Sequence, residues 1–202
     1  MSAMQTSIGT AFGVTAAGLH LAAYALYARY NYRGQQPLHL ATWGLWVILT
    51  WLNATSYLVM SGDSSKSFAS FAGAAACTTV FCLALLRKST AHVDKMDVVL
   101  FAVGLSAAIA WWHWRDATLA NLILQAAITI SMIPTYRRIL ADAGSERPMP
   151  WLLWGTAYVF MLGAVTLRWR GHWPDLAYPV INGTTHLGVG FVSLFGKNRA
   201  SS

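Results

Sequence analysis

The chain has 202 residues, of which 56% are hydrophobic and only 10% are charged. Because soluble domains carry about 25% charged residues, this composition excludes an ordinary soluble protein. The formal net charge of +7 comes from residues that lie almost wholly between long apolar runs, which is typical of topology signals in membrane proteins rather than of nucleic-acid binding. We therefore predict an all-α integral membrane protein that lies in a lipid bilayer and binds no nucleic acid.

Seven apolar stretches are long enough to cross a bilayer as helices, since about 17 to 25 residues are needed. The fifth contains Pro134, where we predict a helix hinge, because a membrane helix tolerates proline only where neighbours satisfy the freed backbone. The N-terminal "MSAMQTSIGT" lacks the basic segment of a cleaved signal peptide, so the first span is expected to remain in the protein. The predicted spans are 7–28, 40–60, 67–86, 97–114, 117–136, 150–167 and 175–195.

Lysine and arginine are distributed unequally between the two ends of the predicted spans. Ten of the fourteen follow the first, third or fifth span or lie in the C-terminal tail. Cytoplasmic loops are enriched in these residues, so we expect the N-terminus outside and the C-terminus in the cytoplasm. The four on the outer side are Lys66, Arg115, Arg168 and Arg170.

A tryptophan motif occurs twice in the chain. Trp-x-Leu-Trp begins at Trp43 and again at Trp151, 108 residues later, and an arginine precedes each motif by fourteen residues, at Arg29 and Arg137. When the sequence is aligned with itself at this offset, the first three spans match the last three. The match predicts two parallel three-helix repeats joined by the fourth span, a 3+1+3 layout. The predicted units are a first three-helix bundle (1–90), a linker helix (91–116) and a second three-helix bundle with a short tail (117–202).

This layout resembles the superfamily of SWEET sugar facilitators, PQ-loop transporters and PnuC vitamin carriers. The segment "SMIPTYRRI", residues 131–139, is similar to the proline-containing end of a PQ-loop helix, with Thr135 where glutamine is expected. "PLHLATWGLW" is similar to a poorly characterised bacterial branch of the group. The resemblance covers nearly the whole layout and implies a transporter fold.

The resemblance carries less information about the substrate. The PnuC pattern Trp-x-x-Trp-x-x-Asn matches at Trp151 and Trp154, but Ala157 stands at the asparagine position. The family also implies a substrate-binding asparagine in the last span, which is Asn182 here. Its counterpart in the first repeat is Ala74, so the paired asparagines of sugar-type members are not reproduced.

Polar and aromatic side chains follow one face of the second predicted span. Trp43, Trp46, Thr50, Asn53 and Tyr57 are separated by three or four residues, which places them on one side of a helix. Such a stripe either lines a pathway for a polar solute or serves packing, with Trp43 as an interfacial anchor and Asn53 bonded to a neighbouring helix. We expect the pathway.

The other spans offer similar groups, with which a hydrophilic solute can replace the water it loses. His186 could bind substrate, exchange a proton or bond another helix, and His20 is a second candidate for proton coupling. The predicted substrate-binding residues are Trp46, Asn53, Tyr57, Gln125, Trp154, Tyr158, Asn182, Thr185 and His186.

The absence of some residue patterns also guides the functional prediction. All seven Asp and Glu residues lie at the ends of predicted spans or in loops, whereas proton pumps usually keep a buried carboxylate. The last span has no Schiff-base lysine of the rhodopsin type, and the His and Cys residues match no metal or disulfide spacing.

We therefore predict a facilitative transporter of a small polar or aromatic metabolite (sugar, nucleoside or vitamin) that works by alternating access, with no enzymatic activity, cofactor or metal, in a bacterial inner membrane. A receptor on the same fold is the alternative, and a membrane enzyme is a weaker one. Gly9, Gly13 and Gly18 offer a helix-packing surface that is compatible with a homo-oligomer.

Overall fold

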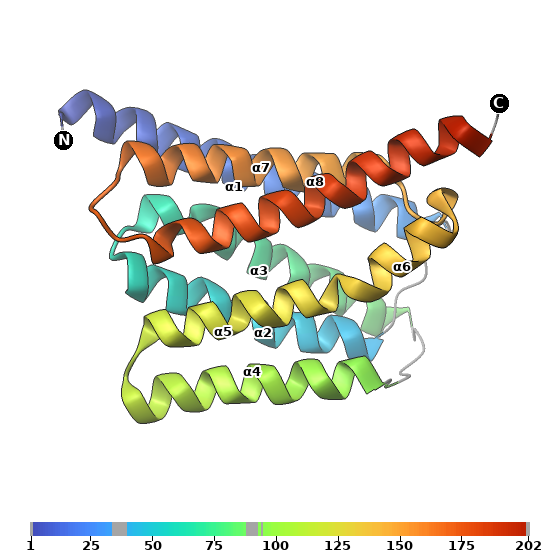
Figure 1. The fold of residues 1–202 in the computed structure, drawn as a ribbon, viewed down its shortest axis with the longest axis horizontal. Helices are drawn as coiled ribbons and strands as arrows, with labels where there is room; N and C mark the ends of the chain where they lie inside the picture. Colours follow the sequence, from blue (N-terminus) through green and yellow to red (C-terminus); the bar gives the residue numbers. More distant parts are fainter. Residues whose placement is uncertain (1, 34–39, 88–92, 94, 201–202) are drawn as a thin grey trace.

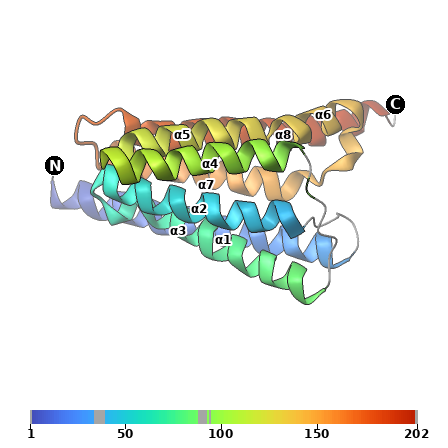
Figure 2. The same ribbon diagram turned by 90° about the horizontal axis from the view of Figure 1, so that it is seen from below.

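The computed structural model describes residues 2–33, 40–87, 93 and 95–200, and within them every regular element is helical. The long helices lie side by side in one bundle, with the two chain ends at opposite ends of it (Figures 1 and 2). The elements are α1 (Ala3–Tyr32), α2 (Leu40–Ser61), α3 (Ser64–Leu86), α4 (Lys95–Trp114), α5 (Ala117–Ser131), α6 (Ile133–Ala141), the short 3₁₀ helix η1 (Ala143–Ser145), α7 (Pro148–Leu167) and α8 (Pro174–Ala200).

Six helical segments of the described chain are long and apolar enough to cross a membrane. They correspond to the first six predicted spans, and they support the prediction of an integral membrane protein. The seventh prediction, 175–195, coincides with α8, which is long enough but is not one of the six. Its middle carries Asn182, Thr184, Thr185 and His186, which make it more polar than the six candidate spans.

Capping residues and glycine set several helix ends. Ser2 and Gln5 form a reciprocal capping box at the start of α1, which satisfies two backbone donors. Asp63 caps α3 by accepting a hydrogen bond from the Ser65 N–H. Gly62 has a φ of 58°, a conformation that favours glycine, so α2 turns into α3 through only two residues.

The predicted hinge at Pro134 coincides with a break between two helices. α5 ends at Ser131 and α6 begins at Ile133, with Pro134 in the first turn of α6. Proline suits a first turn because its missing N–H would have no partner there. The apolar segment continues from Ala117 to Ala141, five residues beyond the predicted end of the fifth span.

Helix packing encloses the centre of the bundle. α3 packs against both α1 and α2, while α8 packs against α5, α6 and α7. Between these groups α1 packs on α7 and α2 packs on α5, and α4 lies on the outside against α5 and α2 (Figure 1). Six helices (α1, α2, α3, α5, α7 and α8) therefore surround the interior.

Two of the three N-terminal glycines serve packing within this chain. A side chain at Gly9 would meet Arg168, and one at Gly13 would meet the backbone of Ser65, so both glycines permit close helix contacts in the bundle. Gly18 has open space beside it. Gly9 and Gly13 are therefore no evidence for an interface with a second copy.

Candidate binding cavity

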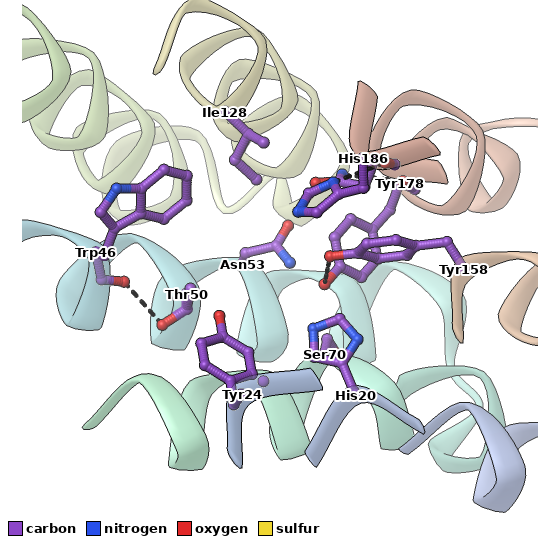
Figure 3. A pocket seen from close by; sticks show the side chains of 12 residues that line it. His20, Tyr24, Trp46, Thr50, Asn53, Ser70, Ile128, Tyr158, Tyr178 and His186 are labelled. Carbon is purple, nitrogen blue, oxygen red and sulfur yellow. Dashed lines mark hydrogen bonds between the residues drawn. The ribbon is translucent and has the colours of Figure 1, made fainter. Parts of the chain in front are cut away.

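A polar cavity lies at the centre of the bundle (Figure 3). Its volume is about 40 Å³, which is room for a few water molecules, so a larger solute requires the helices to separate. None of the described residues that line it is Asp, Glu, Lys or Arg. The lining residues are His20, Tyr24, Trp46, Thr50, Asn53, Ser70, Gly73, Ile128, Tyr158, Tyr178, Asn182 and His186.

Four amide side chains form a hydrogen-bonded network that joins three helices. The Asn53 Oδ1 atom accepts from Asn121 Nδ2 at 3.1 Å and from Gln125 Nε2 at 2.8 Å. Gln125 Oε1 in turn accepts from Asn182 Nδ2 at 2.9 Å. All four side chains are buried, so the network fixes α2, α5 and α8 relative to one another and orients the two asparagines that line the cavity.

Two histidines border the cavity from opposite sides of Tyr158. The His20 and His186 rings lie 5.1 Å and 5.2 Å from the Tyr158 ring, between centroids. His186 Nδ1 lies 2.8 Å from the Asn182 carbonyl, which makes Nδ1 the protonated nitrogen and leaves Nε2 as an acceptor. His20 Nδ1 is buried and has no hydrogen-bond partner within the described chain, although buried polar groups are normally paired.

Tyrosines supply hydroxyl groups to the same cavity. The Tyr158 and Tyr178 hydroxyls lie 3.4 Å apart, and the Tyr24 hydroxyl points toward the cavity from α1 (Figure 3). The Thr50 hydroxyl is less available because it donates to the Trp46 carbonyl at 2.8 Å. The cavity therefore presents aromatic walls together with neutral hydrogen-bonding groups.

Some residues that line the cavity have the same sequence spacing as the two tryptophan motifs. Three pairs of lining residues are separated by 108 residues, the same spacing that separates the tryptophan motifs. These pairs are His20 with Ile128, Thr50 with Tyr158, and Ser70 with Tyr178. Within each pair the side-chain chemistry differs, so the two members of a pair present different groups to the cavity.

Several predicted substrate-binding residues border this cavity. Trp46 and Asn53 lie on α2, Tyr158 on α7, and Asn182 and His186 on α8. His20, the other candidate for proton coupling, borders it from α1, as described above.

The remaining four predicted residues lie outside the lining. Gln125 belongs to the amide network, and Thr185 donates to the Ile181 carbonyl in its own helix. Trp154 packs on His186 and Tyr24, and its buried Nε1 has no partner in the described chain. Tyr57 is fully buried.

The Tyr57 hydroxyl has a structural partner. It donates to the Asp175 carbonyl at 2.8 Å. An α-helix would pair that carbonyl with the N–H of residue 179, which is proline and has none. Tyr57 on α2 therefore satisfies the backbone group that Pro179 leaves unpaired in α8.

Two buried ion pairs lie at one end of the bundle. Lys66 Nζ is 2.6 Å from Asp175 Oδ2, with both side chains almost inaccessible, and the half-exposed His172 lies 2.9 Å from the other Asp175 oxygen. Arg168 Nε is 2.7 Å from Asp63 Oδ2. The pairs join α3 to α8 and the end of α7 to the start of α3.

These carboxylates correct one element of the sequence interpretation. The acids do lie at helix ends, but Asp63 and Asp175 are 5% and 1% exposed, so the expectation that the chain keeps no buried carboxylate is wrong. Helix ends become buried where several of them pack together. The hydropathy of the sequence is a local property, so it does not predict contacts between helix ends that are distant in the chain. The acids remain paired with cations and do not line the cavity.

Sequence reasoning missed several residues of the site and its network, among them the polar residues Asn121, Ser70 and Tyr178. Asn121 lies four residues before Gln125 and Tyr178 four before Asn182, so each shares a helix face with a predicted residue. That spacing was the available signal for both. Ser70 has no comparable signal, because α3 contains other serines at similar spacing.

The described residues include no group of three or more His, Cys, Asp or Glu side chains that could hold a metal ion. The site presents amide, hydroxyl, imidazole and indole groups. No protein-family model, curated protein or solved structure matches this chain.

Proposed function

We propose that this protein is a facilitative transporter of a small, uncharged, polar or aromatic metabolite. The observation that carries the proposal is the polar cavity enclosed by six helices of a bundle that is otherwise apolar enough to lie in a membrane. Polar groups inside a membrane protein are costly and typically mark the path of a solute. The unpartnered His20 Nδ1 and Trp154 Nε1 atoms offer hydrogen bonds that a solute can complete.

An uncharged solute fits the chemistry of the lining. A charged solute that enters a desolvated cavity needs an opposite charge to replace its hydration, and within the described part of the chain no Asp, Glu, Lys or Arg lines this one. The neighbouring ions are already paired with each other. Sugars, nucleosides and neutral vitamins combine hydroxyl or amide groups with faces that stack on aromatic rings, so they suit these walls.

Alternating access between two three-helix bundles is the proposed mechanism. In the proposed layout, α1 to α3 form the first bundle and α4 is the linker. The second bundle consists of α5 to α8, in which α5 and α6 together form one span. The packing of α3 between α1 and α2, the packing of α8 against α5 and α7, and the equivalent lining pairs all support this division. Separation of the bundles at one end and then at the other would expose the cavity to each side in turn.

The proposed orientation places the buried ion pairs on the outer side. The distribution of Lys and Arg supports an external N-terminus and a cytoplasmic C-terminus, and a bacterial inner membrane is the proposed location. Lys66, Asp175, Asp63 and Arg168 would then hold the outer ends of the two bundles together. These contacts must break when the cavity opens outward.

Counterflow in liposomes tests the proposal. Purified protein is reconstituted and assayed with labelled sugars, nucleosides, neutral vitamins and amino acids, with and without a pH gradient. We expect saturable counterflow of one uncharged class that is indifferent to the gradient. Stimulation by the gradient would instead assign proton coupling, for which His20 and His186 are the candidates. Saturable binding without flux would contradict transport and favour a receptor.

Variants test the site separately from the activity. Asn182→Ala and Asn53→Ala remove amides that border the cavity, so counterflow of the identified solute should fall at least about tenfold, as expected for the loss of a hydrogen-bonding group from a site. Thr156→Val is the matched control, because Thr156 is exposed and bonds only a carbonyl of its own helix. Unchanged counterflow in both asparagine variants would show that the site is assigned wrongly.

A further inference from the structure

A second, apolar groove lies on the outer surface between α1 and α3. Its volume is about 260 Å³. Alanines form much of its walls, with Ala25 and Ala28 on α1 and Ala75 and Ala76 on α3. Because these side chains are small, neither helix fills the space between them. Both helices are long and apolar enough to span a membrane, so the groove opens onto the lipid phase.

The groove points toward a cluster of arginines at one end of the same two helices. On α1, Ala25 and Ala28 are followed on the same face by Arg29 and Tyr32, and on α3 Leu83 is followed one turn later by Arg87. The Arg87 guanidinium lies 4.1 Å from the centre of the Tyr32 ring, so the two helix ends meet there.

Among the described residues, this arginine cluster has no carboxylate as an ion-pair partner. Arg29 and Arg87 are exposed, as is Arg33, which caps the end of α1. In the part of the chain that the structure describes, no carboxylate forms an ion pair with any of the three. The three cations lie at the bundle end where most of the Lys and Arg residues gather, which is the proposed cytoplasmic side.

We propose that this groove is a binding site for an anionic phospholipid. One acyl chain occupies the groove between the alanines, and the phosphate lies among Arg29, Arg33 and Arg87. The apolar groove matches the chain, and the uncompensated cations match the negative headgroup, since basic residues at the membrane surface attract anionic lipids and arginine binds phosphate oxygens well. A zwitterionic lipid offers the same chain without the net charge and binds less well.

The lipid site shares one residue with the central cavity. Tyr24 lines both the groove and the cavity, so an acyl chain in the groove contacts a side chain that also borders the solute site. The proposal itself does not depend on transport, because it concerns lipid binding to the outer surface.

Native mass spectrometry of the full chain tests the proposal. Protein purified in detergent is incubated with dioleoyl phosphatidylglycerol or dioleoyl phosphatidylcholine, which have identical acyl chains and differ in net charge. We expect the wild-type protein to retain phosphatidylglycerol at least about fivefold better. Arg87→Gln should reduce that retention about fivefold, since each basic residue near the surface contributes on the order of 1 kcal/mol. Ala25→Phe should reduce it similarly by filling the groove.

Matched variants separate this site from general effects of charge and hydrophobicity. Arg137→Gln removes an exposed arginine of α6, and Ala102→Phe enlarges an exposed alanine of α4. Neither should change retention. Thr79→Phe, from the opposite wall of the groove, replaces Ala25→Phe if that variant is not monodisperse. Equal retention of the two lipids by the wild type, or equal losses in the control variants, would overturn the proposal.

Discussion

Gln125 is the side chain on which the central amide network depends. It donates to Asn53 and accepts from Asn182, and it is 1% exposed. Loss of its amide removes one buried hydrogen bond to α2 and one to α8, whereas Asn53 keeps its bond from Asn121 and Asn182 keeps its bond to the Tyr178 carbonyl.

We expect Gln125→Leu to lower the free energy of unfolding by about 1 to 2 kcal/mol, because hydrogen bonds between membrane helices contribute amounts of this order. Thermal unfolding of the detergent-solubilised protein measures the change. Thr156→Val serves as the control, since it loses only a bond within α7. If the melting temperatures of the two variants were equal, the network would have no special role in stability.

The Lys66 and Asp175 pair gives a second prediction for single residues. Both side chains are almost fully buried, so removal of Lys66 leaves the buried Asp175 carboxylate with the half-exposed His172 as its remaining ionisable partner. Lys66→Met should destabilise the protein by about 3 to 5 kcal/mol. The double variant Lys66→Met with Asp175→Leu should be closer to the wild type, because an apolar pair replaces the ionic one.

Arg170→Gln provides the comparison for this measurement. The Arg170 side chain is 58% exposed and lies 3.9 Å from Asp63, and exposed pairs contribute at most about 1 kcal/mol. Chemical denaturation in mixed micelles compares the variants. A loss in Lys66→Met no larger than that in Arg170→Gln would contradict the assignment of a buried pair.

At the level of elements, two prolines lie within the long helical segments of the bundle. Pro134 separates α5 from α6, and Pro179 lies inside α8. Membrane helices tolerate proline where neighbouring groups satisfy the freed carbonyl. For Pro179 that group is the Tyr57 hydroxyl, so the shape of α8 depends on a side chain from α2.

A double-mutant cycle tests this coupling between α2 and α8. Tyr57→Phe should cost about 1 to 2 kcal/mol of stability, because it leaves the buried Asp175 carbonyl unpaired. The same substitution in a Pro179→Ala background should cost much less, since the residue 179 N–H then pairs with that carbonyl. Thermal unfolding of the four proteins gives the coupling energy, and a value of zero would refute the link.

At the scale of the whole molecule, the positions of the two chain ends decide how the bundle sits in a membrane. The ends lie at opposite ends of the bundle (Figure 1), and Lys and Arg gather toward the C-terminal one. Placement of that end in the cytoplasm gives the proposed orientation. The ion pairs and the lipid groove would then border opposite sides of the bilayer.

Cysteine accessibility checks this orientation. In a background with Cys77→Ala and Cys82→Ala, single substitutions Arg170→Cys and Ala141→Cys place thiols at exposed positions at opposite ends of the bundle. A membrane-impermeant maleimide should label Arg170→Cys in intact cells and Ala141→Cys only after permeabilisation. The reverse pattern would invert the proposed topology.

The positions of the helices were predictable from the sequence, and the physical reason is the cost of polar groups in lipid. An apolar run of sufficient length has to be a helix, because only a helix satisfies its backbone hydrogen bonds internally. Six of the spans predicted on this basis are confirmed in the described chain by length and composition. The side-chain period of a helix also predicted that Asn53 and Trp46 share a face. The proline at position 134 likewise marked the place where α5 ends.

The tertiary structure alone decided which groups meet. Trp46 and Trp154 occupy the same place in the two tryptophan motifs. Trp46 lines the cavity, whereas Trp154 packs on His186 outside the lining. Asp63 and Asp175 read as helix-end acids in the sequence, yet their burial beside Arg168 and Lys66 depends on the meeting of helices more than 100 residues apart. Hydropathy and periodicity are local properties of the sequence, so they predict where each helix lies in the chain and which residues share a face. Packing between distant helices determines the cavity, its polar network and its ion pairs.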